Sequence, residues 1–265
     1  MGGRDRALRM RRGRSSVGSV ASDDELALSF GQDAATYESA RPEYPRAAVD
    51  WALEPINAAY STIIDLGAGT GKLTRTLVAT GADVLAVEPD AEMATELMAQ
   101  IPGVETYLGR GEAIPLADAS ADAITYGQAW HWVDGEQGTA EAARVLRPGG
   151  VLALLWNVGD ESSPLVARML EIMGPAPADR YLAGGVRVGA PFEPLEEARF
   201  DWSAPITAAG ILDSARSRST FIRAAAEEQA RIIRELTEMN AELGLVGDAT
   251  AEFAYVTRAF RTIRP

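Results

Sequence analysis

The chain alternates short apolar runs with helical patterns, and this alternation limits the folds open to it. The apolar runs, most of which end in a turn residue, cover 61–67, 83–89, 104–109, 122–127 and 151–157. The helical patterns between them cover roughly 71–80, 90–100 and 136–146. Short buried strands that alternate with helices form a parallel sheet covered on both faces. Right-handed crossovers between these strands then predict a doubly wound α/β fold.

The two ends of the chain are less regular than its middle. Residues 1–25 are rich in Gly, Ser and Arg and predict a disordered extension, with a transit peptide as the alternative. We therefore expect one domain over 26–265. In the C-terminal third, 173–194 has the Pro and Gly content of a loop, and 220–244 has a long amphipathic helix pattern. The β-branched and aromatic residues of 252–262 predict a final strand that closes the sheet.

Composition excludes several kinds of site. The chain has no cysteine and one histidine, so disulfides, thiolate metal sites, cysteine nucleophiles and histidine-cluster metal sites are absent. We therefore expect no metal. The formal net charge of −13 argues against bulk attraction to nucleic acid or anionic membranes. No apolar run approaches the ~20 residues of a membrane span. These features favour a cytoplasmic protein whose partner is a small molecule.

The sequence IIDLGAGTGKLT, residues 63–74, contains a glycine-rich loop directly after the first apolar run. A phosphate-binding P-loop needs G-x-x-x-x-G-K-[ST], but Leu66 and Leu73 stand where its first glycine and its hydroxyl residue belong. A dinucleotide loop needs G-x-G-x-x-G, and Lys72 stands at its third glycine. Both of these sites are therefore poor matches, although NAD stays an alternative.

S-adenosylmethionine (SAM) fits the loop better. SAM has no pyrophosphate, so the helix that follows the loop need not bind an anion. Its methionine amino group is a cation, and the carboxylate of Asp65 at the strand end is placed to bind it directly or through water. The next apolar run ends at Glu88, 21 residues after Gly67. An acidic residue at that distance binds ribose hydroxyls in nucleotide sites of this topology.

Several segments together resemble the class I SAM-dependent methyltransferases. The resemblance is carried by IIDLGAGTGKLT, VLAVEPD, GRGEAIPLADASAD, GQAWHWVD and RVLRPGGVLALLWN, and it covers about residues 27–262. It implies a Rossmann-like, seven-stranded, mostly parallel sheet with helices on both faces. FGQDAATYESARPEYP and GQAWHW look like the methyltransferase type 11 branch that includes trans-aconitate methyltransferase-like proteins.

The resemblance implies roles for particular residues. Gly111 and Glu112 match the position that contacts the edge of adenine, with an ordinary turn as the alternative. Gln128 and Ala129 match positions at the methionine end. Tyr37 and Arg41 are candidates for the methionine carboxylate and a lid, with a solvated covering helix as the alternative. The implied cofactor-binding set is Tyr37, Arg41, Asp65, Gly67, Ala68, Gly69, Gly71, Glu88, Pro89, Gly111, Glu112, Gln128 and Ala129.

The acceptor side is predicted from residues that follow the fourth and fifth strands. His131 lies between Trp130 and Trp132, and three roles stay open for it: catalytic base, pocket wall or core residue. The two tryptophans are core aromatics or contacts to the sulfonium. Candidate substrate-binding residues, each with a core, cap or surface ion-pair role as its alternative, are Trp130, Trp132, Trp156, Asn157, Arg218 and Arg258.

These observations predict an enzyme that transfers the SAM methyl group to a small molecule. On the resemblance, the favoured acceptor atom is an oxygen of a carboxylate or hydroxyl. Methylation at nitrogen or carbon, an NAD-dependent oxidoreductase and a SAM-binding module without catalysis are the alternatives.

Overall fold

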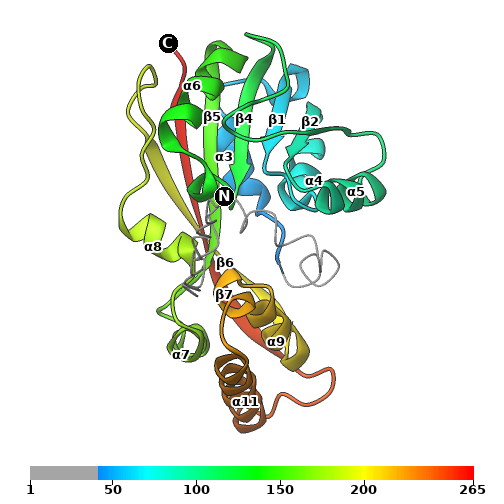
Figure 1. The fold of residues 1–265 in the computed structure, drawn as a ribbon, viewed down its shortest axis with the longest axis vertical. Helices are drawn as coiled ribbons and strands as arrows, with labels where there is room; N and C mark the ends of the chain where they lie inside the picture. Colours follow the sequence, from blue (N-terminus) through cyan, green and yellow to red (C-terminus); the bar gives the residue numbers. More distant parts are fainter. Residues whose placement is uncertain (1–40) are drawn as a thin grey trace, which may run out of the picture.

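The computed structural model describes residues 41–265, and it contains one seven-stranded sheet with the order β3-β2-β1-β4-β5-β7-β6 (Figure 1). The predicted extension over 1–25 and Tyr37 lie outside the described residues. The strands are β1 (Thr62–Leu66), β2 (Asp83–Glu88), β3 (Glu105–Leu108), β4 (Ala121–Gly127), β5 (Leu146–Gly159), β6 (Glu196–Thr207) and β7 (Thr250–Ile263).

The described helices follow the alternation expected from the sequence up to β5. Their bounds are α3 (Arg46–Leu53), α4 (Lys72–Val78), α5 (Ala91–Gln100), α6 (Gly135–Val145), α7 (Pro164–Met173), α8 (Pro177–Ala183), α9 (Ala208–Arg216), α10 (Ser219–Ile222) and α11 (Ala226–Glu242). Short 3₁₀ turns are η2 (Ala58–Tyr60) and η3 (Trp130–Trp132). No helix within 41–265 combines the length and apolar character needed to cross a membrane.

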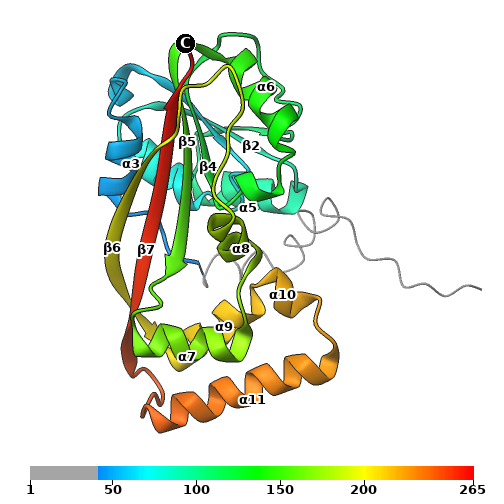
Figure 2. The same ribbon diagram turned by 90° about the vertical axis from the view of Figure 1, so that its left-hand side faces the viewer.

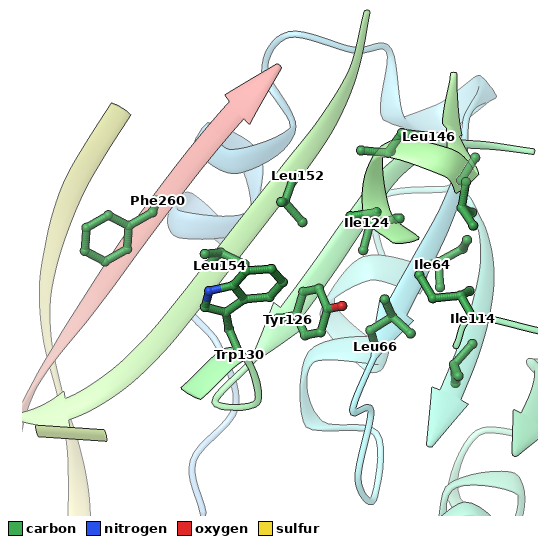
Figure 3. Close-up of a cluster of buried hydrophobic side chains, with 14 of the residues drawn as sticks. Ile64, Leu66, Ile114, Ile124, Tyr126, Trp130, Leu146, Leu152, Leu154 and Phe260 are labelled. Atoms are coloured by element: carbon green, nitrogen blue, oxygen red, sulfur yellow. The ribbon is translucent and has the colours of Figure 1, made fainter. Parts of the chain in front are cut away.

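The sheet is covered on both faces. Helices α3 and α4 bury Val49 and Leu77 against one face, where they meet Ile63 of β1. Ile64 and Leu66 of the same strand face the other way and pack with α6 through Val145. Figure 3 shows this second cluster, in which the β1, β4 and β5 side chains lie beside one another. Because successive side chains of a strand point to opposite faces of the sheet, one strand contributes to the core on both faces.

Strand direction brings the ends of three strands to one edge. β1 pairs in parallel with β2 on one side and with β4 on the other. The connection reverses between β1 and β4, which is the switch point where open α/β sheets bind ligands beyond the carboxyl ends of their strands. Asp65, Glu88 and Gln128 come at or just after these carboxyl ends.

The three strands β5, β7 and β6 continue beyond this edge and carry a small helical cap (Figures 1 and 2). β7 is antiparallel to both of its neighbours. We call α7, α9 and α11, together with the beginning of β7, the helical cap. Its apolar cluster contains Met169, Ile211, Leu236 and Phe253. The cap therefore has a core of its own.

The structure corrects four expectations for the C-terminal half. The 173–194 segment is not all loop, because α8 forms within it. The 220–244 pattern is two helices, α10 and α11, interrupted at 223–225. β7 is a strand as predicted, but it lies inside the sheet, and β6 forms the edge. β6 was missed because it has no continuous apolar run; its signal is the alternation of Ala198, Phe200 and Trp202 with polar residues, which is typical of a half-buried strand.

The turn predicted at 148–150 is not separate from the strand, because these residues lie within β5, where the pairing is irregular. Ala121 of β4 pairs with Leu146, and Ala123 pairs with Val151, so the register shifts across these residues. Gly149 has a φ of +81°, which favours glycine.

The core of the helical cap predicts a specific stability effect. Leu236 is fully buried, so Leu236→Ala should lower the free energy of unfolding by about 2–5 kcal/mol through lost burial and a residual cavity. Glu238, two residues further along α11 and exposed, provides the matched control Glu238→Ala. Urea unfolding followed by circular dichroism measures both. Equal effects of the two substitutions would contradict the packing described for the cap.

Candidate active site

Two adjoining cavities open at the carboxyl edge of the sheet. The larger, about 310 Å³, lies between the end of β1 and the helical cap. The smaller, about 140 Å³, lies between the ends of β2 and β4 and η3. Eight residues line both cavities and mark their junction: Arg41, Gly67, Gly69, Gly127, Gln128, Ala176, Ala178 and Arg218. The site is therefore one continuous space with two compartments.

The glycine loop brings bare backbone to this junction. Gly67 has a φ of +64°, and a Cβ added there would lie 2.5 Å from the Cβ of Ala129. At Gly71, with a φ of +94°, a Cβ would lie 2.6 Å from Cδ1 of Ile101. Both positions therefore need glycine for backbone conformation and for space. Gly69 and Ala68 between them also line the larger cavity.

Glu88 is held by the loop that it faces. The backbone N–H of Gly69 donates to its Oε2 at 2.8 Å, and the N–H of Asp90 donates to its Oε1 at 3.0 Å. Burial raises the pKa of the Glu88 carboxyl to about 7, while these two hydrogen bonds oppose the rise. Glu88 and Pro89 line the smaller cavity. An ionised Glu88 thus needs a further partner that offers hydrogen bonds.

Asp65 is the second buried carboxyl. The hydroxyls of Thr74 and Thr125 donate to its two oxygens at 2.7 and 3.2 Å. Burial raises the pKa of Asp65 to about 7, against the lowering effect of the hydroxyl bonds. Asp65 lines the larger cavity beside Gly67. Two carboxyls with raised pKa values therefore lie at the ends of adjacent strands, which is typical of functional sites.

The rest of the smaller cavity comes from loops after β3 and β4. Gly111, Glu112 and Ala129, which the resemblance assigns to one cofactor site, all line this cavity. Oε1 of Glu112 accepts the N–H of Asp134 at 2.8 Å, which fixes the loop. Gln128 has a φ of +57°, an uncommon conformation for a residue with a side chain. Such strain is concentrated at functional sites, and Gln128 lies at the junction of the cavities.

The Trp130–His131–Trp132 triplet divides between core and cavity. Trp130 is 1% exposed and packs edge-on against Tyr126, in the core cluster of Figure 3. His131 and Trp132 line the smaller cavity. Trp156 is fully buried, and its indole N–H donates to Nδ1 of His131 at 3.2 Å. The core role left open for Trp130 and Trp156 is the one observed, and neither tryptophan lines these two cavities.

Two candidate acceptor-binding residues on the larger cavity already have hydrogen-bond or ion-pair partners within the protein. Asn157 lines this cavity, but its side-chain amide donates to the carbonyl of Glu43 and its Oδ1 accepts the hydroxyl of Thr257. Arg258 also lines it, while its guanidinium binds Glu197 at 2.5 and 2.8 Å. The expected ion-pair alternative is therefore observed for Arg258.

Arg218 differs from Arg258. It donates from Nη1 to the carbonyl of Gly174 at 3.2 Å. Among residues 41–265, no carboxylate lies within 4.0 Å of its guanidinium. Burial first, and then the nearby charge of Arg41, lower the pKa of Arg218 to about 10, against the influence of Asp179 and Tyr255. Arg218 and Arg41 thus concentrate positive charge at the junction of the cavities.

Several residues of the site were not predicted from the sequence. Thr74, which binds Asp65 but lines neither cavity, has a local signal, since it lies in the first turn of the helix after the glycine loop. Ala178 and Leu182 of α8 and Tyr255 of β7 line the larger cavity. They have no such signal, because their position depends on the long-range pairing of β7 with β5 and on how α8 packs.

Comparisons with known proteins agree with this geometry. The methyltransferase-domain family model matches residues 64–154, which contain the glycine loop, Glu88 and His131. An uncharacterised methyltransferase of Mycobacterium tuberculosis is 40% identical and covers 81% of this chain and 86% of its own length. A malonyl-[acyl-carrier protein] O-methyltransferase of Enterobacter lignolyticus is 31% identical over 60% of this chain and 63% of its own length.

A solved structure supports the same assignment. It comes from Anaeromyxobacter dehalogenans and is assigned as a type II methyltransferase. Its TM-score is 0.64 and its identity 25%, and the match covers 83% of this chain and 97% of that one. With the glycine loop, two buried strand-end carboxyls and a methyltransferase relative that matches most of both chains, the chain belongs to the class I SAM-dependent methyltransferases and uses SAM as its cofactor.

Proposed function

We propose that this enzyme transfers the SAM methyl group to an oxygen of a small anionic molecule, with a carboxylate as the acceptor class. The observation that carries this proposal is the pair of arginines, Arg41 and Arg218, at the junction of the two cavities. A cavity of about 310 Å³ beside the glycine loop is of a size that suits a small ligand.

We assign the cofactor to the smaller cavity and the glycine loop. Glu88 would bind the ribose hydroxyls, which supply the donors that its ionised form needs. Gly111 and Glu112 would contact the adenine edge. Asp65 would face the methionine ammonium, whose positive charge favours the ionised carboxylate. The remaining proposed contacts to the cofactor come from Ala68, Gly69, Gly71, Pro89, Gln128 and Ala129.

The charges at the junction argue for a second anion. SAM brings one carboxylate together with a sulfonium and an ammonium group, and we assign its carboxylate to Arg41. Arg218 then stays available for an anion on the acceptor. A guanidinium that is buried beside another cation is unfavourable alone, and a bound carboxylate relieves that cost. Arginine also matches the planar shape of a carboxylate through two parallel hydrogen bonds.

The outer part of the larger cavity adds apolar walls to this charged end. Leu170 of α7, Leu182 of α8 and Phe253 of β7 line it. Such a pocket suits a molecule with one anionic end and an apolar body. The relative whose name gives a malonyl acceptor methylated at oxygen supports an oxygen acceptor as well.

The chemistry asks little of the protein beyond positioning. When bound, SAM supplies an electrophilic methyl group, so the acceptor oxygen forms the new C–O bond while the C–S electron pair returns to sulfur. A carboxylate is already ionised at neutral pH, so no proton moves and no base is required. Arg218 would orient the acceptor, and the cap would exclude water from the reacting atoms.

Methylation at nitrogen or carbon is the competing proposal. The family assignment sets aside an NAD-dependent oxidoreductase and a SAM-binding module without catalysis. Membership of the trans-aconitate methyltransferase-like branch stays a hypothesis, and so do a cytoplasmic location and the absence of nucleic-acid binding. An acceptor screen with methyl-labelled SAM distinguishes the chemistries, since base hydrolysis of a methyl ester releases labelled methanol. Malonate, aconitate and benzoate are suitable anions, with ethanolamine as an amine.

Glu88 provides the first prediction for the cofactor. Glu88→Gln should weaken binding of S-adenosylhomocysteine (SAH) by about tenfold or more, because hydrogen bonds to a charged group contribute about 1.5–3 kcal/mol. Glu92→Gln, an exposed acid on α5, is the matched control and should bind SAH normally. Isothermal titration calorimetry measures both. Unchanged SAH affinity in the Glu88 variant would contradict the proposal that Glu88 binds the ribose hydroxyls.

Arg218 provides the second prediction. Arg218→Gln should raise KM for a carboxylate acceptor about 10- to 100-fold, since it removes a charged hydrogen-bond donor, and should leave SAH affinity within about threefold. Arg216→Gln is the control, because Arg216 is exposed, pairs with Asp213 and lines neither cavity. Initial-rate kinetics measure KM. An Arg218 variant that loses SAH affinity but keeps its KM would assign Arg218 to the cofactor instead.

Asp65 provides a pH prediction for the cofactor-free protein. Its pKa is about 7 when folded and about 3.9 when unfolded, so the folded state keeps a proton that the unfolded chain releases. Stability from this group is full below pH ~4 and is lost as pH rises through 7. Asp65→Asn cannot ionise, so its stability relative to the natural protein should increase by about 3–4 kcal/mol between pH 4 and 8.

Urea unfolding at several pH values tests this prediction. Glu88 titrates in both proteins, so to a first approximation the difference isolates Asp65. A stability difference that stays constant with pH would show that Asp65 has an ordinary pKa.

A further inference from the structure

The hydrogen bond between Trp156 and His131 determines which ring nitrogen carries the proton. An indole N–H can only donate, so Nδ1 of His131 must accept with its lone pair. In neutral histidine one nitrogen is a donor and the other an acceptor. Nε2 therefore carries the hydrogen. Trp156 is fully buried, and turning the ring would set a C–H against its indole N–H.

The same bond fixes the direction of the ring. Nδ1 faces Trp156, which lines neither cavity, so Nε2 points away from that tryptophan. His131 itself is partly exposed and lines the smaller cavity. The rings of Trp132 and Tyr181 also pack near the imidazole, with ring centroids 4.7 and 6.2 Å from its own. The edge of the ring that remains for the cavity is the edge with Nε2.

We propose that His131 presents a neutral Nε2–H donor to the cofactor cavity, and that Trp156 is the positioning residue that holds it in this form. A general base needs a lone pair at the nitrogen that faces the substrate. Here that lone pair would require the hydrogen on Nδ1, where it would meet the indole N–H. The geometry thus opposes the base role and favours a donor. The donor role rests on the proposed function, whereas the assigned tautomer does not.

Burial and the nearby cation act in the same direction. Burial first, and then the positive charge of Arg41, lower the pKa of His131 to about 4. Arg218 and Arg110 line the same cavity, whereas the carboxyls of Glu88 and Glu112 there favour a protonated ring. A neutral ring adds a hydrogen-bond donor without adding another cation next to the sulfonium. It also leaves the enzyme without a base at this position, which a carboxylate acceptor does not need.

Nuclear magnetic resonance can test the tautomer directly, because His131 is the only histidine in the chain. Protein labelled with ¹⁵N and free of a histidine tag gives a single set of imidazole nitrogen signals. We expect Nε2 to show the shift of a protonated nitrogen and Nδ1 that of an unprotonated one, with no titration between pH 8 and 5. A hydrogen on Nδ1, or a titration near pH 6.5, would overturn the proposal.

Two further measurements test the positioning and the direction of the donor. Saturation with SAH should shift the Nε2–H signal and slow its exchange with water, since SAH fills the cavity that His131 lines. An unchanged signal at saturation would show that the donor faces elsewhere. Trp156→Phe removes the indole N–H and should give a mixture of tautomers and a higher His131 pKa, with SAH affinity within about threefold.

The outcome does not depend on which acceptor the enzyme uses. A single Nε2–H tautomer that persists in Trp156→Phe would show that Trp156 does not hold it. If Trp156→Phe fails to fold, the spectra of the unaltered protein with and without SAH still decide the tautomer and its direction. Failure of the carboxylate screen would leave these spectra unchanged, so the two proposals fail separately.

Discussion

The burial of two carboxyls at the ends of neighbouring parallel strands is the constraint on which the rest of the site depends. Pairing of β1 with β2 places Asp65 and Glu88 at one edge of the sheet, out of contact with bulk water. Each is kept there by donors from its own surroundings: hydroxyls for Asp65 and backbone N–H groups for Glu88. Burial disfavours their ionised forms, and a ligand with a cation and hydroxyl groups reverses that preference.

The second half of the chain encloses the site at the carboxyl edge of the sheet. β5 and β7 continue past the edge and carry the helical cap, which closes the larger cavity opposite the glycine loop (Figure 2). α8 packs against the sheet core and lines both cavities through Ala178. Arg218, at the start of α10, reaches the junction from the cap side. In the proposed function, the sheet would therefore bind the cofactor and the cap would select the acceptor.

The sequence predicted most of the sheet but little of the cap. Local patterns suffice for β1, β2 and β4, because a buried parallel strand is a continuous apolar run, and the glycine loop marks the site. β6 lacks this signal, since one face of its strand is solvated. Trp130 and Trp156 lie close to functional residues in the sequence, yet their side chains point into the core. Only the packing of η3 against β5 and α8 determines which residue of a triplet faces a cavity.

Calorimetric titration with SAH at pH 7, repeated in buffers with different ionisation enthalpies, tests the central claim most directly. If Asp65 and Glu88 bind the cofactor in their ionised forms from pKa values near 7, binding must release roughly one proton. The observed enthalpy then changes with the buffer, and the change is smaller in Asp65→Asn. Tight binding with an enthalpy that is the same in every buffer would contradict the account.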